Sequence, residues 1–258
     1  MGMITKKKLV VGNWKMNPDS LIKVKEIIQN LKKTALKLDK IKTIICPPFI
    51  YLPEVANGLK NTKNFSPGAQ DVHFVEGGAF TGEVSLSMVK SLGCKYVIVG
   101  HSERREAGET DEIVSKKVGI VSKGGLTAIL CVGEKTRDGH GDFWHVLREQ
   151  ITKSLNKINR PMLKNLVIAY EPVWAIGAKQ AMIGNDLQQT VIFIKKTLSD
   201  TYGRDCADKI PVLYGGSVSP KNTLDLIQAG TVDGLLIGRE SIKTKDFVQV
   251  LEIVNSLK

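Results

Sequence analysis

The sequence predicts a single α/β domain folded as a closed (β/α)8 barrel, in which eight parallel strands alternate with helices. Three observations support this prediction. Short β-branched runs alternate with longer segments of helical period along the chain. Such alternation is typical of right-handed βαβ crossovers and a parallel sheet. Eight units, with no linker or shift in composition anywhere in residues 1–258, favour a closed barrel over an open doubly wound sheet.

The strands are expected where short apolar, β-branched runs occur. In chain order these are Leu9–Gly12, Thr43–Cys46, Phe65–Ala69, Tyr96–Gly100, Thr127–Val132, Leu166–Tyr170, Pro211–Tyr214 and Gly234–Ile237. Helical patterns lie between them. The first helix follows the start signal Pro18-Asp19-Ser20 and is marked by Leu21, Val24, Ile27, Ile28 and Leu31. The last helix is marked by Phe247, Val250, Leu251 and Val254.

Composition indicates an ordinary globular protein, with 42% hydrophobic and 24% charged residues. The longest apolar runs are strand-sized, so we expect no membrane span, and the basic N-terminus lacks the apolar stretch of a signal peptide. The four cysteines, Cys46, Cys94, Cys131 and Cys206, are widely separated, which favours reduced thiols in a cytoplasmic protein. The segment HGDFWH (140–145) lacks a third ligand at metal spacing, so no metal site is expected.

The net charge of +11 comes mostly from lysines scattered over predicted helix faces. Arginine is scarce, and no aromatic-basic cluster or helix-turn-helix pattern stands out, which disfavours a nucleic-acid partner. A positive field that attracts a small anionic substrate fits this distribution better.

One predicted βα loop, residues 71–85, is unusually long and carries Phe74, Val75 and Phe80. A monomer could not easily bury these side chains, and long ordered loops and exposed apolar patches usually serve a function or meet a partner. We therefore expect a symmetric homodimer that uses this loop.

Polar residues gather after three of the predicted strands, where a barrel of this class has its active site. Asn13 and Lys15 follow the first strand, His101 and Glu103 the fourth, and Glu171 the sixth. A carboxylate can take a proton from carbon beside a carbonyl, provided that a hydrogen-bond donor and a cation stabilise the developing enediolate.

Small residues follow the sixth, seventh and eighth strands, in Ala175-Ile176-Gly177, Tyr214-Gly215-Gly216-Ser217 and Gly238-Arg239. Such turns let backbone N–H groups approach an anion, and phosphate sites after the seventh and eighth strands are frequent in this fold. The predicted substrate is therefore a small sugar phosphate.

Each of these residues also has a purely structural interpretation. Glu171 could be an ion-paired acid at a strand end, Lys15 a solvated lysine, and His101 a histidine buried under a loop. Glu103 could pair only with the adjacent arginines, and the glycines could be ordinary turn residues. These interpretations weaken together, because all the residues fall at one rim of the predicted barrel.

Seven segments together resemble the triosephosphate isomerase family along essentially the whole chain. They are GNWKMN (12–17), GAFTGEVS (78–85), VGHSERR (99–105), CVGE (131–134), AYEPVWAIG (169–177), YGGSV (214–218) and VDGLLIG (232–238). The resemblance implies a TIM barrel that interconverts D-glyceraldehyde 3-phosphate and dihydroxyacetone phosphate, in glycolysis and gluconeogenesis. It also implies a cytoplasmic homodimer that needs no cofactor or metal.

The resemblance further implies a role for each site residue, and the glutamate base and neutral histidine are general knowledge of this family. Glu171 would move the proton, a neutral His101 would act on the carbonyl, and Lys15 would stabilise the enediolate with Asn13 hydrogen-bonding its oxygen. Glu103 would support Lys15. The backbone N–H groups of Gly177, Ser217, Gly238 and Arg239 would bind the phosphate. The segment Pro172-Val173-Trp174 would be the first hinge of a lid, and Thr81 would reach toward the partner's active site.

The sequence departs from the family pattern at three places. The lid continues as AIGAKQAM (175–182) without a second glycine, and HSERREAGET (101–110) is about one residue short. Arg239 stands where a second glycine is usual, so its side chain either contacts the phosphate or points to solvent. Two alternatives therefore stay open: an isomerase of a four-carbon sugar phosphate, and a non-catalytic sugar-phosphate-binding barrel. Retention of Asn13, Lys15, His101 and Glu171 speaks against the second.

Overall fold

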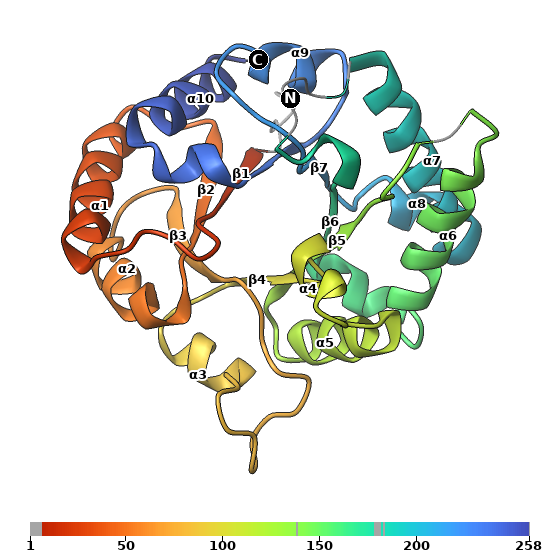
Figure 1. Ribbon diagram of the computed structural model, residues 1–258, viewed down its shortest axis with the longest axis horizontal. Helices are drawn as coiled ribbons and strands as arrows, with labels where there is room; N and C mark the ends of the chain where they lie inside the picture. The colour runs from red at the N-terminus through yellow and green to blue at the C-terminus, as the bar shows by residue number, and fades with distance from the viewer. Residues whose placement is uncertain (1–6, 138, 178–181, 183, 258) are drawn as a thin grey trace, which may run out of the picture.

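The computed structural model describes residues 7–137, 139–177, 182 and 184–257, and it contains a closed barrel of parallel strands (Figure 1). The strands are β1 (Lys8–Asn13), β2 (Ile41–Cys46), β3 (Phe65–Ala69), β4 (Tyr96–Val99), β5 (Thr127–Val132), β6 (Leu166–Tyr170), β7 (Val212–Tyr214) and β8 (Gly234–Ile237). They pair in chain order, and β1 closes the barrel on β8 with Leu9 opposite Gly234. The predicted (β/α)8 fold is confirmed.

Helices form a ring around the strands (Figure 1). The α-helices are α1 (Leu21–Ala35), α2 (Leu52–Gly58), α3 (Leu86–Ser91), α4 (Ser102–Glu106), α5 (Asp111–Lys123), α6 (Asp142–Ser154), α7 (Gly184–Tyr202), α8 (Arg204–Ala207), α9 (Thr223–Gln228) and α10 (Thr244–Ser256). Short 3-10 helices are η1 (Phe49–Tyr51), η2 (Arg160–Asn165), η3 (Val173–Ala175) and η4 (Arg239–Ile242). In the described part of the chain, none of the helices has the length and apolar character needed to cross a membrane.

The first helix begins where the sequence predicts. Ser20 is extended and caps α1, because its side chain accepts a hydrogen bond from the backbone N–H of Lys23. The stripe from Val24 to Leu31 is buried, but Leu21 is 45% exposed and lies outside it. Another small difference concerns β4, which ends at Val99 because Gly100, with a φ of +68°, turns the chain out of the strand.

Strand side chains divide into two cores, one inside the barrel and one between the barrel and its helices. The inner core contains Leu9, Val11, Ile44, Cys46, Ile98, Ile129, Cys131, Val167, Ala169, Leu213 and Leu236. Side chains alternate between the two faces of a strand, so inner positions recur at every second residue. On β6 the inner series Val167 and Ala169 continues to Glu171, and on β1 the series Leu9 and Val11 continues to Asn13. This alternation directs both polar side chains toward the mouth of the barrel.

The 71–85 loop projects from the barrel between β3 and α3, at the bottom of Figure 1. Its base is fixed by a buried cluster of charges: Lys117 Nζ lies 2.7 Å from Asp71 Oδ2 and also contacts Glu109. Arg104 Nη2 adds a second cation 2.9 Å from Asp71 Oδ2. The tip, residues 76–83, is exposed, with Phe80 at 44%. The loop is therefore anchored on the barrel and open to solvent at its end.

Candidate active site

Glu171 follows β6 directly and is 2% exposed, although it carries a carboxylate. Its Oε1 lies 3.0 Å from Nε2 of His101, and its Oε2 accepts a hydrogen bond of 3.1 Å from the backbone N–H of Ser102. The loop after β7 lies against it, because a Cβ added to Gly215 would be 2.8 Å from Glu171 Cγ. The carboxylate is thus positioned by the ends of three strands.

His101 follows the turn at Gly100 and lies 5% exposed at the start of α4. Its Nδ1 accepts a hydrogen bond of 3.2 Å from the backbone N–H of Glu103. A nitrogen that accepts a hydrogen bond carries no proton, so this contact places the ring proton on Nε2, facing Glu171. The geometry therefore describes a neutral imidazole whose only N–H donor points into the site.

The two buried groups shift each other's pKa. Burial lowers the pKa of His101, but the neighbouring Glu171 carboxylate outweighs burial and raises it above its ordinary value of 6.5. Burial raises the pKa of Glu171, but His101, the Ser102 amide and Lys15 together lower it below its ordinary value of 4.5. Glu171 is consequently an ionised carboxylate at neutral pH, despite its burial.

Lys15 lies across the mouth from this pair. Its Nζ is 2.6 Å from Glu103 Oε1, which orients the ammonium group. Its backbone is in the left-handed region, with a φ of +54°, and its N–H donates to Asn13 Oδ1 over 3.0 Å. Gln70 Nε2 also donates to the carbonyl oxygen of Lys15 over 2.9 Å. These contacts stabilise an unusual backbone conformation that turns the lysine toward the cavity.

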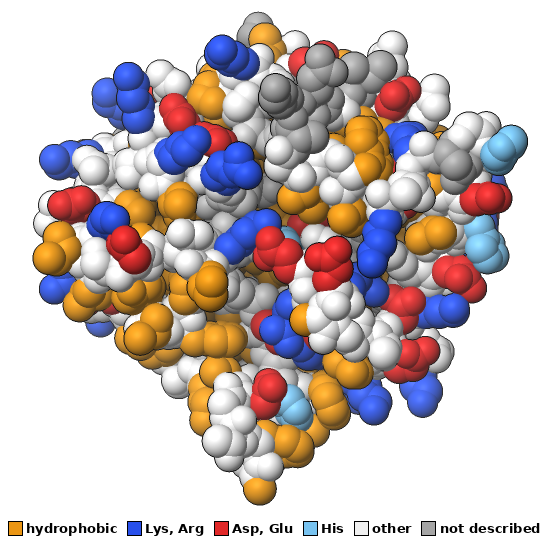
Figure 2. Space-filling view, in the orientation of Figure 1, with side chains coloured by type: hydrophobic (Ala, Val, Ile, Leu, Met, Phe, Trp, Pro, Cys, Tyr) orange, Lys and Arg blue, Asp and Glu red, His pale blue; other side chains and the backbone are white. Residues whose placement is uncertain are grey.

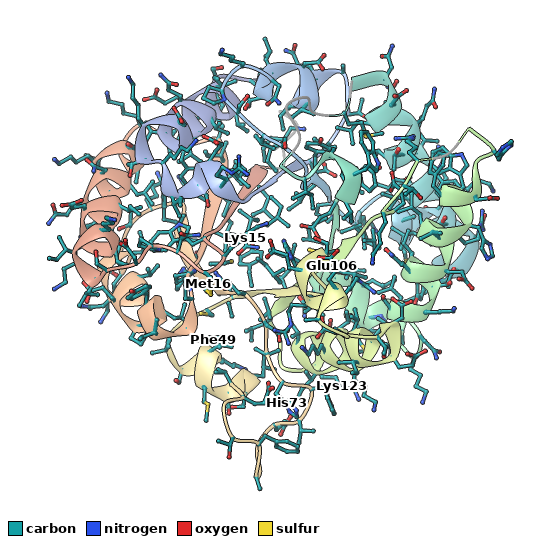
Figure 3. All side chains as sticks on the ribbon, in the orientation of Figure 1. Lys15, Met16, Phe49, His73, Glu106 and Lys123 are labelled. Carbon is teal, nitrogen blue, oxygen red and sulfur yellow. The ribbon has the colours of Figure 1, made fainter. Side chains whose placement is uncertain are left out.

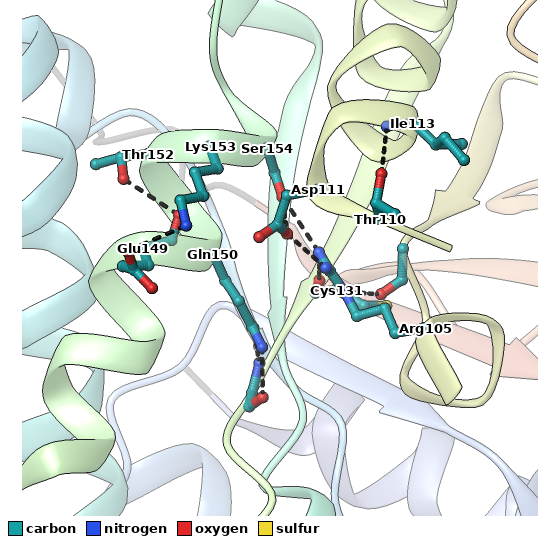
Figure 4. A network of polar contacts seen from close by, with 12 residues as sticks. Arg105, Thr110, Asp111, Ile113, Cys131, Glu149, Gln150, Thr152, Lys153 and Ser154 are labelled. Atoms are coloured by element: carbon teal, nitrogen blue, oxygen red, sulfur yellow. Dashed lines mark hydrogen bonds and ion pairs between the residues drawn. The ribbon is translucent and has the colours of Figure 1, made fainter. Parts of the chain in front are cut away.

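A polar network behind the site holds the ends of β4 and β5 (Figure 4). Arg105 donates to the carbonyl oxygens of Gly100 and Cys131 and forms an ion pair of 2.6 Å with Asp111. Gln150 of α6 exchanges two hydrogen bonds with the backbone of Gly133, just after the end of β5. Because Gly100 immediately precedes His101, this network positions the imidazole through the backbone.

All the predicted site residues line one cavity of about 450 Å³. They are Asn13, Lys15, His101, Glu103, Glu171, Gly177, Ser217, Gly238 and Arg239. Figure 3 labels Lys15 near the centre of the ring of helices, over the mouth of the barrel. Within the described ranges, no group of three or more His, Cys, Asp or Glu side chains is arranged to hold a metal ion.

Hydrogen bonds to two neighbouring loops hold the segment around Glu171 in place. Trp174 Nε1 and Tyr170 Oη each donate to Oε1 of Glu134 over 2.8 Å. Ser217 Oγ donates to the carbonyl oxygen of Ala175 over 2.8 Å. The missing second glycine of the predicted lid falls on residues 178–181, which lie outside the described residues.

Sequence reasoning did not predict the contacts that three residues make at the site. Glu134 has the same signal as Glu171, a lone carboxylate just after an apolar strand, but it binds the lid segment instead of facing the cavity. The backbone N–H of Ser102 donates to Glu171, and Gly215 lets its loop approach Glu171 closely because it has no side chain. The only available signal for these two was their place in the turns after β4 and β7.

A parallel (β/α)8 barrel with a carboxylate, an imidazole and an ammonium group at the carboxyl ends of its strands belongs to the class of barrel enzymes. Residues 8–254 match the family model described as triosephosphate isomerase. The chain is 40% identical to the triosephosphate isomerase of Natranaerobius thermophilus, over 95% of each chain. It is 39% identical to that of Dehalococcoides mccartyi, over 94% of each, and 40% identical to that of Carboxydothermus hydrogenoformans, over 96% of this chain and 98% of the other. The chain belongs to the triosephosphate isomerase family and is an enzyme of that family.

Proposed function

We propose that this site interconverts dihydroxyacetone phosphate and D-glyceraldehyde 3-phosphate by moving one proton between adjacent carbons. The observation that carries the proposal is the contact of 3.0 Å between Glu171 and the N–H side of a buried His101, in a cavity that also contains Lys15. A binding protein needs no buried, ionised base, whereas proton abstraction from carbon does.

Glu171 acts as the base. It removes a proton from C1 of dihydroxyacetone phosphate, and the C–H electron pair becomes the C1–C2 double bond while the carbonyl electrons move onto the C2 oxygen. The conjugate acid of Glu171 then returns the proton to C2. Transfer of the hydroxyl proton from O1 to O2, assisted by His101, leaves an aldehyde at C1. Atoms and charge balance, and no redox partner is required.

His101 and Lys15 stabilise the enediolate. The Nε2–H of His101 donates to the substrate oxygens, and the substrate takes the place that Glu171 Oε1 occupies beside the ring in the free site. Lys15 adds a positive charge to a cavity from which the closed lid would exclude water, so that electrostatic attraction becomes strong. Glu103 positions that ammonium group, and Asn13 hydrogen-bonds a substrate oxygen through an amide nitrogen that donates to none of the described residues.

The phosphate group binds to backbone N–H groups of Gly177, Ser217, Gly238 and Arg239. Gly177 has a φ of +74°, a conformation that glycine adopts without strain, so the lid tip can present its N–H to an anion. Closure of the lid that begins at Pro172 excludes water from the enediolate and prevents loss of its phosphate.

A direct assay tests this proposal. The protein should isomerise three-carbon phosphates much faster than four-carbon ketose phosphates, because triose phosphates are the substrates that the family name specifies. Lys15→Met should remove most of the activity and leave the unfolding temperature nearly unchanged. Comparable rates on four-carbon substrates would support the alternative isomerase. Absence of isomerisation with retained phosphate binding would support the non-catalytic barrel.

We also propose that two copies form a homodimer through the 71–85 loop and the flank beside it. Hydrophobic side chains gather on this lower-left flank in Figure 2, and Figure 3 labels Met16 and Phe49 there. Met16 is 94% exposed, and Met88, just beyond the loop, is 57% exposed. Leaving such side chains in water is unfavourable. Because Met16 adjoins Lys15, a partner that covers it, with its Thr81 nearby, would complete the wall of the active site.

Sedimentation provides the test of the dimer. Wild-type protein should sediment as a dimer at micromolar concentration, and Met16→Glu, which places a charge in the proposed interface, should sediment as a monomer with reduced activity. Leu36→Glu replaces a 92% exposed apolar residue at the end of α1 and serves as the control. A monomeric wild type, or a dimeric Met16→Glu variant, would contradict the proposal.

A cytoplasmic location in a glycolytic pathway completes the proposal. Its support is the set of four free cysteines, three of them buried, which suits a reducing compartment. Triose phosphates are the substrates that the family name implies for such a pathway.

A further inference from the structure

The mechanism above assigns no role to the side chain of Arg239, although this residue lines the active-site cavity. Arg239 opens η4, directly after the turn at Gly238 that follows β8. No described acidic side chain forms an ion pair with it. The adjacent Glu240 contacts Lys243 instead, over 2.9 Å. An arginine that is left unpaired beside a cavity is available to an anionic ligand.

The guanidinium group reaches the lid. Its Nη2 lies 3.6 Å from the point that a Cβ on Gly177 would occupy, and Gly177 is the lid tip. At the neighbouring turn, Lys15 Nζ lies 3.7 Å from the point that a Cβ on Gly238 would occupy. Each of the two glycines that present an N–H to the proposed phosphate site therefore has a cationic side chain next to it.

We propose that the side chain of Arg239 binds the substrate phosphate directly and determines the preference for phosphorylated substrates. This inference rests on the proposed function of the same site. A guanidinium group presents a planar fork of N–H donors that matches two phosphate oxygens, whereas backbone N–H groups alone supply no net charge. The arginine thus adds both a full positive charge and a second pair of donors at the position where the lid closes.

The proposal differs from two simpler roles for the same residue. If Arg239 only held the lid closed, its removal would slow turnover of every substrate, with or without a phosphate. If it only contributed to the overall positive field, removal of any exposed arginine would have the same effect. A direct phosphate contact affects only ligands that carry a phosphate, and it affects their affinity.

The test compares Arg239→Ala with Arg239→Lys and with the control Arg204→Ala, which removes a charge from an 87% exposed side chain on α8. Three quantities are measured: the Kd of inorganic phosphate, kcat/KM for D-glyceraldehyde 3-phosphate, and kcat/KM for unphosphorylated D-glyceraldehyde. A lost charge-assisted hydrogen bond predicts that Arg239→Ala weakens phosphate binding and lowers the first kcat/KM by about 10-fold or more. Glyceraldehyde turnover should not change, and lysine should restore part of the loss.

Two results would overturn the inference. One is a phosphate Kd in Arg239→Ala that equals the Kd in Arg204→Ala. The other is an equal loss of activity on the phosphorylated and unphosphorylated substrates, which would indicate a lid contact. If the wild-type protein itself did not isomerise triose phosphates, the proposed function would fail first. The wild-type assay therefore separates the two failures.

Discussion

At the scale of single residues, the site depends on the pair formed by Glu171 and His101. Burial alone would favour a protonated acid and a neutral ring. The contact between them keeps the acid ionised, and the Glu103 amide on Nδ1 keeps the ring's N–H directed at the acid. We propose that a substrate entering between the two groups meets a base and a hydrogen-bond donor that already lie side by side.

This arrangement predicts a change in the pKa of His101 when Glu171 loses its charge. In the wild-type protein, burial lowers the pKa of the ring, but Glu171 raises it above its ordinary value, so the imidazolium form should appear below that raised pKa. Glu171→Gln removes the carboxylate charge and keeps the shape of the side chain. Burial and Lys15, which both lower the pKa, are then opposed by the smaller effect of Glu103, and the ring should stay neutral to lower pH.

A titration of the ring nitrogens by NMR, in the wild-type protein and in Glu171→Gln, measures this shift. A His101 pKa that stays the same or rises in the variant would show that Glu171 does not control the ring.

At the scale of elements, buried charges hold the loops on which the site and the proposed interface depend. Lys117 of α5 is 3% exposed and binds both Asp71 at the base of the 71–85 loop and Glu109 before α5. Burial raises the pKa of Asp71, although Lys117 and Arg104 oppose the rise. The charged groups of this cluster have lost their hydration, and close ionic contacts offset that cost. Removing one partner should therefore destabilise the folded protein.

Lys117→Met should lower the free energy of unfolding by about 3 kcal/mol, because it leaves two buried carboxylates with only the half-exposed Arg104 as a remaining cation among the described residues. Urea unfolding measures the change. Lys123→Met, at the exposed end of the same helix, should change stability by less than about 1 kcal/mol. Equal effects of the two substitutions would mean that the cluster does not stabilise the loop.

The elements also show how much the sequence alone could predict. The strands are located almost to the residue, because parallel strands buried on both faces are short apolar runs. The position of Glu171 followed from its place after such a run. The Glu134–Trp174 contact joins residues that are 40 positions apart, and Lys117 binds residues that are 8 or more positions away. These contacts depend on where side chains meet in space, so the periodicity of the sequence does not predict them. The tautomer of His101 depends on a single backbone hydrogen bond and was likewise outside the reach of pattern reasoning.

At the scale of the whole molecule, the protein combines a net charge of +11 with a cavity proposed to take a phosphate. Attraction of this kind raises the rate of encounter, and salt screens it over about 10 Å at 0.1 M. The value of kcat/KM for D-glyceraldehyde 3-phosphate should therefore fall several-fold between low and physiological ionic strength. The kcat/KM for unphosphorylated glyceraldehyde, which carries no charge, should stay constant. A similar fall in kcat/KM for both substrates would contradict electrostatic steering.

In the proposed mechanism, the barrel holds the Glu171 carboxylate at a fixed distance from the substrate. Glu171→Asp tests this account most directly, because it keeps the charge and retracts the carboxylate by one methylene group. We expect kcat to fall by about 10²-fold or more, since small misplacements of a catalytic group have large effects on rate, with little change in KM or in the phosphate Kd. A variant with wild-type kcat would show that Glu171 is not the base.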